Sequence, residues 1–203
     1  NSIELSQDVL SFIQGKDSLV DEVFKNQEKF KLQIIYSQTN QISNDSVEVL
    51  NAKLSNYNAY FYPASAIKLP CAILTLEKLN ALSIPTLHYF RIGDEFFCGN
   101  MSHVKNSNKY KSSYYDMIKI MLTVSDNTAY NSVYEFLTPA YITNQLMDRN
   151  LRSINIYKRF AGCSVAENLK INSISFYNAN DDFMIKQEAS VLGLAEMAEK
   201  YKY

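Results

Sequence analysis

The sequence has few of the residues from which nucleotide and metal sites are commonly built. Only five of its 203 residues are glycine, and none of them form a G-x-G-x-x-G or G-x-x-x-x-G-K pattern. Loops of those kinds cradle phosphates, so we expect no nucleotide cofactor. The three cysteines, Cys71, Cys98 and Cys163, lie far apart and form no Cys-x-x-Cys pair. We therefore expect no zinc, no other metal and no cofactor. If the protein is exported, the cysteines can form one disulfide and leave one free thiol.

Strong charge and long apolar runs are lacking as well. The 20 basic and 21 acidic side chains leave a net charge of −1, so we expect neither a nucleic acid nor an anionic membrane surface as a partner. No run approaches the roughly 18 apolar residues that a membrane-spanning helix needs. The chain begins at Asn1 rather than Met, and we expect a mature, exported form whose signal peptide has been removed.

Enough apolar residues are present to build a core, because the chain is 47% hydrophobic and 13% aromatic. Its length favours a single domain, residues 1–203. Helical spacing of apolar residues predicts helices at about 5–30, 65–82, 114–124, 129–137, 138–147 and 188–201. Residues 29–38 and 46–51 are typical of a β-hairpin. Residues 83–113 are expected to be mostly irregular, and residues 150–185 are expected to form a long loop with short elements.

Ser65 and Lys68 stand at the start of the helix predicted at 65–82, in "PASAIKLP". Residues at i and i+3 share one face of a helix, so a lysine whose pKa is lowered by burial can accept the serine proton during attack on an acyl carbon. The alternative interpretation is that these two residues have no catalytic role and only cap the start of the helix. A second Ser-x-x-Lys match, Ser102 and Lys105, is read as chance because it stands in a polar segment expected to be a loop.

Ser125, Asp126 and Asn127 directly follow the apolar helix predicted at 114–124. Such a cluster is a typical helix N-cap. It also places a second hydroxyl and an amide at the edge of a core, where they can pass a proton and hold a substrate carbonyl. The two histidines, His88 and His103, adjoin no G-x-S-x-G, so nothing favours a Ser-His-Asp triad, and we expect both on the surface or in loops.

The Ser-x-x-Lys motif at Ser65 is followed 60 residues later by the Ser-Asp-Asn motif at Ser125. This order and spacing resemble the first two sequence motifs, or boxes, of class A serine β-lactamases and the related penicillin-binding proteins. The resemblance implies an α/β fold in which a helical lobe packs on an antiparallel sheet, with residues 1–203 as its N-terminal two-thirds to three-quarters. It also implies a periplasmic or secreted protein that acts on β-lactams or related acyl amides and is connected with antibiotic resistance.

By motif, the resemblance implies that Ser65 is the acylated nucleophile, with its backbone N–H as an oxyanion donor, and that Lys68 is the base or proton relay. Ser125 passes a proton to the leaving nitrogen. Asn127 binds the substrate's amide side chain, and Asp126 fixes the turn. Glu167 is the candidate for the glutamate that activates water for deacylation, although its spacing differs from the family's Glu-x-x-Leu-Asn.

The third box of these enzymes, Lys-Thr-Gly or a relative, does not occur in the sequence. We therefore expect a truncated chain that holds only the N-terminal hairpin of the sheet, completed by a missing C-terminal segment or a second copy. Three functions stay open: a β-lactamase, a penicillin-binding or peptidase-like acyltransferase with slow deacylation, and a non-catalytic domain or inactive fragment.

Overall fold

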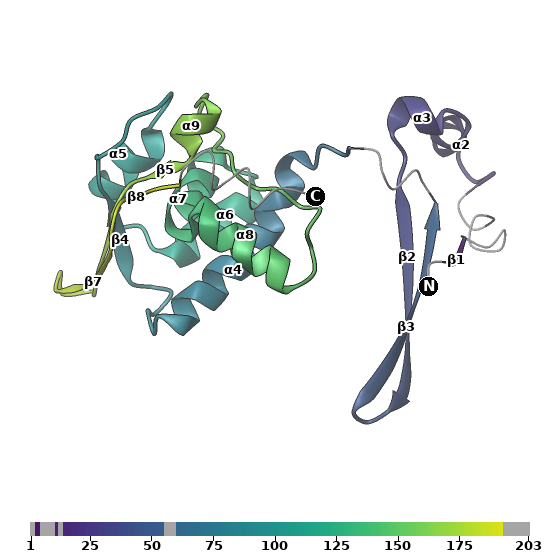
Figure 1. Cartoon of the computed structure of the whole chain (residues 1–203), viewed down its shortest axis with the longest axis horizontal. Helices are drawn as coiled ribbons and strands as arrows, with labels where there is room; N and C mark the ends of the chain where they lie inside the picture. Colours follow the sequence, from purple (N-terminus) through teal and green to yellow (C-terminus); the bar gives the residue numbers. More distant parts are fainter. Residues whose placement is uncertain (1–2, 5–10, 12–13, 55–59, 193–203) are drawn as a thin grey trace. The chain divides into compact units, whose positions relative to one another are not determined.

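The computed structural model describes residues 3–4, 11, 14–54 and 60–192, and these group into two compact units, residues 1–62 and 63–203 (Figure 1). The first unit contains one sheet, and the second unit contains two among the described residues. The single domain spanning 1–203 stays a prediction. The mixed α/β class expected from the sequence is confirmed, with small antiparallel sheets and many helices.

The first unit contains the hairpin that the sequence predicts. Its elements are β1 (Ile3–Glu4), α2 (Ser18–Lys25), α3 (Gln27–Phe30), β2 (Ile34–Ser43) and β3 (Ser46–Leu54). The long strands β2 and β3 are antiparallel, and β1 adds to β3 in parallel, so the strand order is β1-β3-β2. Asp17 caps α2 by accepting hydrogen bonds from the N–H groups of Leu19 and Val20.

Two expectations for this unit need correction. The strand expected from residue 29 begins only at Ile34, because Lys29 and Phe30 close α3 and Lys31 turns the chain in the left-handed region. The helix expected at 5–30 is interrupted at 14–17, and the shorter helices α2 and α3 follow. Residues 5–10 and 12–13 of that expected helix lie outside the described residues.

The second unit carries most of the helices. Its elements are η1 (Ala64–Ile67), α4 (Lys68–Ala81), β4 (Tyr89–Ile92), α5 (Ser102–Lys109), α6 (Tyr114–Thr123), α7 (Asn127–Leu137), α8 (Pro139–Asp148), α9 (Val165–Asn168), β5 (Lys170–Ile171), β6 (Ile174–Tyr177), β7 (Phe183–Gln187) and β8 (Ser190–Val191). The helices expected at 65–82, 114–124, 129–137 and 138–147 are therefore confirmed as η1–α4, α6, α7 and α8.

An antiparallel sheet of order β4-β6-β7 runs along one side of these helices (Figure 1). Phe90 of β4 pairs with Phe176 of β6, so both side chains are on one face of the sheet. Tyr114 of α6 stacks on Phe90 with ring centroids 4.2 Å apart, and Phe136 of α7 meets Phe176 at 5.5 Å. These buried rings hold the helical layer on the sheet, in agreement with the predicted layer arrangement.

The sequence missed this sheet. The segment 83–113, expected to be mostly irregular, contains β4 and α5. The segment 150–185, expected to be a long loop with short elements, contains α9, β5, β6 and the start of β7. The hairpin is therefore not the only sheet element in the described residues. The helix expected at 188–201 is wrong at its start, because Ser190 and Val191 form β8 beside β5; its residues from 193 onward lie outside the described residues.

Candidate active site

Ser65 lies in the 3₁₀ turn η1, and Lys68 begins α4 directly after it. Pro70 follows in the first turn of α4, where the missing N–H of proline costs no helical hydrogen bond. The next turns of α4 bury Cys71 and Leu74 in the core, which fixes the helix end that carries both residues. The sequence therefore placed Ser65 and Lys68 correctly at the start of a helix.

Lys68 is almost fully buried, with 2% of its surface exposed. Burial lowers the pKa of its ammonium group below the ordinary lysine value, and the negative charge of Asp126 opposes that shift. The net direction is downward, so the neutral amine is more accessible at a given pH than for a lysine in water. This is the electrostatic condition that a lysine base requires.

The Ser125–Asn127 segment forms the turn between α6 and α7. Ser125 has a φ of 57°, in the left-handed region that residues other than glycine seldom occupy. Asp126 caps α7, because its Oδ1 accepts a hydrogen bond from the Ala129 N–H at 2.7 Å. The cap anchors the turn to a helix that is buried from Ala129 to Leu137.

The two motifs meet. Lys68 Nζ lies 3.0 Å from Ser125 Oγ and 2.8 Å from Asn127 Oδ1, and it also bonds to the Ser125 carbonyl oxygen. Ser125 Oγ donates in turn to Ser65 Oγ at 2.9 Å. Ser65 is thus joined to Lys68 through the Ser125 hydroxyl, and the four side chains that the sequence singled out for acylation and substrate binding form one cluster.

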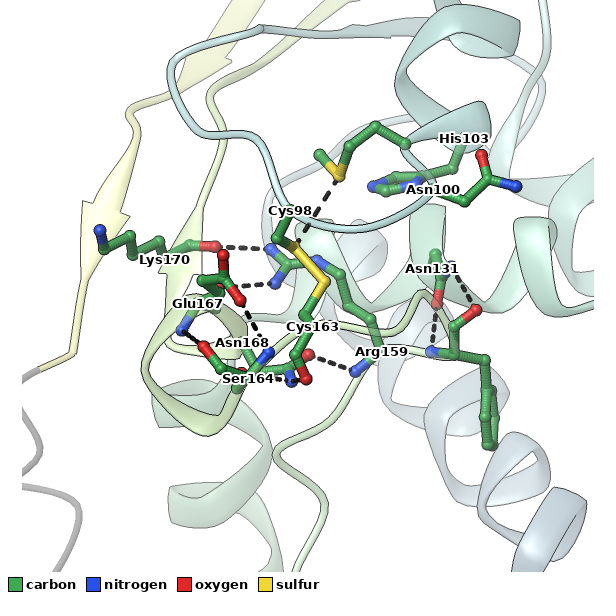
Figure 2. Close-up of a disulfide and its surroundings, with 12 residues drawn as sticks. Cys98, Asn100, His103, Asn131, Arg159, Cys163, Ser164, Glu167, Asn168 and Lys170 are labelled. Atoms are coloured by element: carbon green, nitrogen blue, oxygen red, sulfur yellow. Dashed lines mark hydrogen bonds between the residues drawn. A yellow bond between two sulfur atoms is a disulfide. The ribbon is translucent and has the colours of Figure 1, made fainter.

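Glu167 is not part of this cluster. It is the third residue of the short helix α9, and its carboxylate accepts a hydrogen bond from the Ser164 N–H at 2.7 Å in a capping box. Figure 2 shows this pair beside the disulfide. Hydrogen bonding to the Ser164 side chain, and then to the Ser164 N–H, lowers the pKa of the Glu167 carboxyl. No hydrogen bond between the described residues connects Glu167 with Ser65, Lys68 or Ser125.

Phe160 is a neighbour of Lys68 that sequence reasoning missed. The centroid of its ring lies 5.4 Å from Lys68 Nζ. Its backbone is held by Asn131 of α7, whose Oδ1 accepts from the Phe160 N–H at 2.8 Å and whose Nδ2 donates to the Phe160 carbonyl at 3.4 Å. The contact spans 29 residues, so no local pattern in the sequence signals it.

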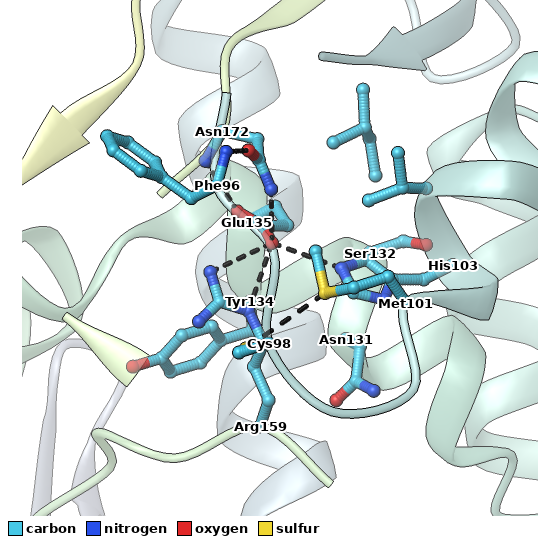
Figure 3. Close-up of polar contacts among 12 residues, drawn as sticks. Phe96, Cys98, Met101, His103, Asn131, Ser132, Tyr134, Glu135, Arg159 and Asn172 are labelled. Atoms are coloured by element: carbon cyan, nitrogen blue, oxygen red, sulfur yellow. Dashed lines mark hydrogen bonds and ion pairs between the residues drawn. The ribbon is translucent and has the colours of Figure 1, made fainter. Parts of the chain in front are cut away.

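A buried network of charged side chains adjoins Phe160 through the preceding residue, Arg159. Glu135 has no exposed surface, and Figure 3 shows its carboxylate facing Arg159, His103 and Asn172. Its Oε1 lies 2.8 Å from Arg159 Nη2 and 3.0 Å from His103 Nε2, and its Oε2 accepts from the Asn172 N–H at 2.9 Å. His103 is thus a core residue of α5, which corrects the expectation of a surface histidine.

The remaining sequence expectations concern Ser102, Lys105 and the cysteines. Ser102 and Lys105 lie in α5 rather than in a loop, but Lys105 is exposed and meets no comparable cluster. Cys98 and Cys163 form a disulfide with a Cα–Cα distance of 5.3 Å, and Cys71 is a free thiol in the core. Burial raises the pKa of the Cys71 thiol to about 12.

The described residues contain neither a cluster of metal-ligating side chains nor a membrane-spanning helix. No group of three or more His, Cys, Asp or Glu side chains is arranged to hold a metal ion. Within the same described ranges, no helix is both long enough and apolar enough to cross a membrane.

The fold and the site together define a mixed α/β protein that carries a hydrogen-bonded Ser-Ser-Lys cluster at the start of a helix. Residues 20–196 match the model of the β-lactamase enzyme family. The match covers most of the chain, and the chain belongs to this family. No curated protein and no solved structure matches it in the corresponding searches.

Proposed function

We propose that this protein is a serine hydrolase or acyltransferase that opens β-lactam amides, or related acyl amides, through an acyl-enzyme on Ser65. The observation that carries the proposal is the chain of hydrogen bonds from Lys68 through Ser125 to Ser65, found in a member of the β-lactamase enzyme family. Ser102 and Lys105 repeat the motif without the buried cluster, so the motif alone does not account for the arrangement.

The bond chain supports a defined proton path for acylation. Once Lys68 is neutral, the two hydrogen bonds reverse their direction: the Lys68 lone pair accepts the Ser125 proton, and Ser125 Oγ accepts the proton of Ser65. Ser65 Oγ then forms a bond to the acyl carbon, and the carbonyl becomes an oxyanion near the start of the helix. The N–H of Ser65 is the proposed donor to that oxyanion, because N–H groups of the first helical turn have no partner inside the helix.

The same atoms support the second half of acylation. When the C–N bond breaks, the departing nitrogen takes a proton from Ser125, and the Lys68 ammonium restores the Ser125 proton. The Asn127 side-chain oxygen is engaged by Lys68 at 2.8 Å. Its amino group is therefore the part that donates to a substrate carbonyl. After these steps the acyl group is an ester on Ser65 and Lys68 is again neutral.

The proposal also includes export to an oxidising compartment, such as the periplasm or the cell exterior. The Cys98–Cys163 disulfide supports it, since disulfides persist in such compartments and are rare in a reducing cytosol. The proposed partner is a small β-lactam or acyl amide. Turnover of β-lactams there would protect a cell against them.

The test is a mass measurement of the intact protein after incubation with benzylpenicillin, together with an assay of released penicilloic acid. We expect either a covalent adduct of penicillin mass or the hydrolysed product, and neither for Ser65→Ala. Ser102→Ala is the matched control, because it removes a serine from the same motif outside the cluster, and it should behave as the parent protein. If the parent yields neither adduct nor product, the non-catalytic reading replaces the proposal.

A further inference from the structure

A cavity of about 260 Å³ in the second unit is lined by residues of β4, α5, α6 and the first turns of α7. Asp126 is in its wall, but the four side chains of the candidate active site are not. Pockets for drug-sized ligands begin at about 300 Å³, so this cavity suits a smaller organic molecule. The side chains in its wall indicate which molecule it can hold.

His103 brings an unpaired nitrogen to this cavity. The residue lines the cavity and is 1% exposed. Its Nε2 lies 3.0 Å from Glu135 Oε1, and Figure 3 shows this contact. Its other ring nitrogen, Nδ1, is buried and has no hydrogen-bond partner among the described residues. Because buried polar atoms are normally hydrogen-bonded, a ligand in the cavity can supply the partner that the protein does not.

The charges around His103 decide which kind of partner Nδ1 needs. Glu135 is a carboxylate that accepts hydrogen bonds, so His103 Nε2 is the donor in their contact. Arg159 pairs with the same carboxylate at 2.8 Å and compensates its charge, so a neutral imidazole keeps this buried network balanced. A neutral ring with its proton on Nε2 has a lone pair on Nδ1. The ligand group that fits is therefore an O–H or N–H donor.

Asp126 supplies a negative charge to the same cavity. Its side chain is half-buried, and its Oδ1 accepts a hydrogen bond from the Ala129 N–H at 2.7 Å. An ionised carboxylate can accept further hydrogen bonds, and the strongest come from a charged donor. Glu135, which His103 contacts, lies about 13 Å farther along α7 than Asp126. The carboxylate and the imidazole therefore lie toward opposite ends of the cavity and suit an elongated molecule.

The rest of the wall includes apolar side chains. Phe90 of β4 has no exposed surface, and Met117 and Ile120 come from α6. Such side chains gain from contact with an apolar ligand, because the contact removes apolar surface from water. The wall thus combines a carboxylate, an acceptor nitrogen and an apolar surface, and each of the three selects a different part of a ligand.

We infer that this cavity binds a small organic ammonium compound whose ammonium group pairs with Asp126 and whose hydroxyl, at the other end of an apolar body, donates to His103 Nδ1. The site goes beyond the proposed function and does not require acylation of Ser65. Since Asp126 stands between Ser125 and Asn127 in the chain, a bound ligand would contact the turn that carries both.

Tyramine is the probe, because it has an ammonium group and a phenolic hydroxyl at opposite ends of an apolar body. Titration calorimetry at pH 7 compares it with 4-ethylphenol, which lacks the ammonium group, and with phenethylamine, which lacks the hydroxyl. We expect tyramine to bind the parent protein. 4-Ethylphenol should bind about tenfold or more weakly, and phenethylamine about threefold or more weakly, as the loss of a charged and of a neutral hydrogen bond predicts.

Asp126→Asn tests the ammonium end of the site. An asparagine at this position can still cap α7, so we expect a folded protein whose affinity for tyramine falls about tenfold or more, to the level of 4-ethylphenol. Asp17→Asn is the matched control, because it removes the same charge from the cap of α2 in the first unit. It should bind tyramine as the parent does.

Nuclear magnetic resonance locates the ligand. In protein labelled with ¹³C at the methionine methyl groups, we expect a nuclear Overhauser effect between the tyramine ring protons and the Met117 methyl group. Met117→Leu assigns that signal. The ligand series and this measurement use the parent protein, so they decide the question even where Asp126→Asn fails to fold.

Four results would overturn the inference. The first is a parent that does not bind tyramine at millimolar concentration. The second is equal affinity for tyramine and either of its analogues, which would remove the Asp126 or the His103 contact. The third is a folded Asp126→Asn protein that binds tyramine as tightly as the parent. The fourth is a tyramine signal to other methionines and none to Met117, which would place the ligand elsewhere. Each leaves acylation of Ser65 as a separate question.

Discussion

Ser125 is the residue whose role the geometry sharpens most. The family resemblance implies that it delivers a proton to the leaving nitrogen. In the structure its hydroxyl also stands between the Ser65 hydroxyl and the Lys68 amine, at 2.9 and 3.0 Å. Its positive φ of 57° shows that the turn accepts backbone strain at this position. A residue held in this way can act in both halves of acylation.

The two roles of Ser125 can be separated with two acyl donors. In Ser125→Ala, we expect acylation by benzylpenicillin and by 4-nitrophenyl acetate to fall by about a hundredfold or more, within the usual range for acid–base groups. The ester is informative because 4-nitrophenolate leaves without taking a proton. Stopped-flow release of 4-nitrophenolate measures it, with Ser102→Ala as the control. An ester rate that is unchanged while the penicillin rate falls would restrict Ser125 to the leaving group.

Residue types and spacing were enough to single out Ser65, Lys68, Ser125 and Asn127, because each pair of motif residues lies within one turn of chain. The structure brings these four side chains into one cluster. They were not enough for Phe160, whose position depends on an amide 29 residues away. The same holds for Glu135, which meets Arg159 across 24 residues and His103 across 32. Buried charges that pair over such distances leave no periodic signal in a sequence.

At the scale of elements, the Lys78 side chain connects α4 with α7 and β7. It lies on α4, donates to the carbonyl oxygen of Phe136 near the end of α7, and donates to Gln187 Oε1 of β7 at 2.8 Å. The rings of Phe136 and Tyr141 stand 4.4 and 5.0 Å from its Nζ. Burial without a carboxylate partner in these contacts lowers the pKa of Lys78 to about 8.

This lowered pKa makes the stability of the fold depend on pH. Above pH 8 the folded protein has lost the Lys78 proton, while the unfolded chain keeps it up to about pH 10.4. The free energy of unfolding should therefore rise across that window, by up to about 3 kcal/mol from this group. Below pH 8 the lysine is charged in both states and adds nothing further to the pH dependence.

Urea unfolding at pH 7, 8, 9 and 10 checks the expectation. Lys78→Met is the comparison, because it keeps the volume of the side chain and removes the titrating group. The parent should gain stability relative to Lys78→Met as pH rises, since other groups that titrate in this range are common to both proteins. A difference that stays constant from pH 7 to 10 would contradict a depressed Lys78 pKa.

The short elements of the second unit explain why the sequence missed part of the fold. The long helices were readable from apolar spacing over ten or more residues. The strands β4 and β6 have four residues each, too few for alternation to stand out from neighbouring Asn and Ser. Their pairing is decided by tertiary contacts, above all by the stack of Phe90, Tyr114, Phe136 and Phe176.

At the scale of the whole molecule, one covalent link closes a large part of the second unit. The Cys98–Cys163 disulfide joins positions 65 residues apart, and the segment between them carries α5 to α8 together with Ser125 and Asn127. Closing a loop of that length reduces the entropy of the unfolded chain and stabilises the fold by about 4 kcal/mol in the chain-entropy account. The link is therefore a major part of the stability of a domain, which is about 5–15 kcal/mol.

The expected result is that Cys98→Ala/Cys163→Ala unfolds in urea with a free energy lower by about 4 kcal/mol than the oxidised parent. Removing both cysteines avoids a lone reactive thiol. Dithiothreitol should destabilise the parent by a similar amount and leave the double variant unchanged, because the third cysteine, Cys71, is buried and already free. If the double variant matched the oxidised parent, the link would not support the fold, and the argument for an oxidising compartment would lose its structural basis.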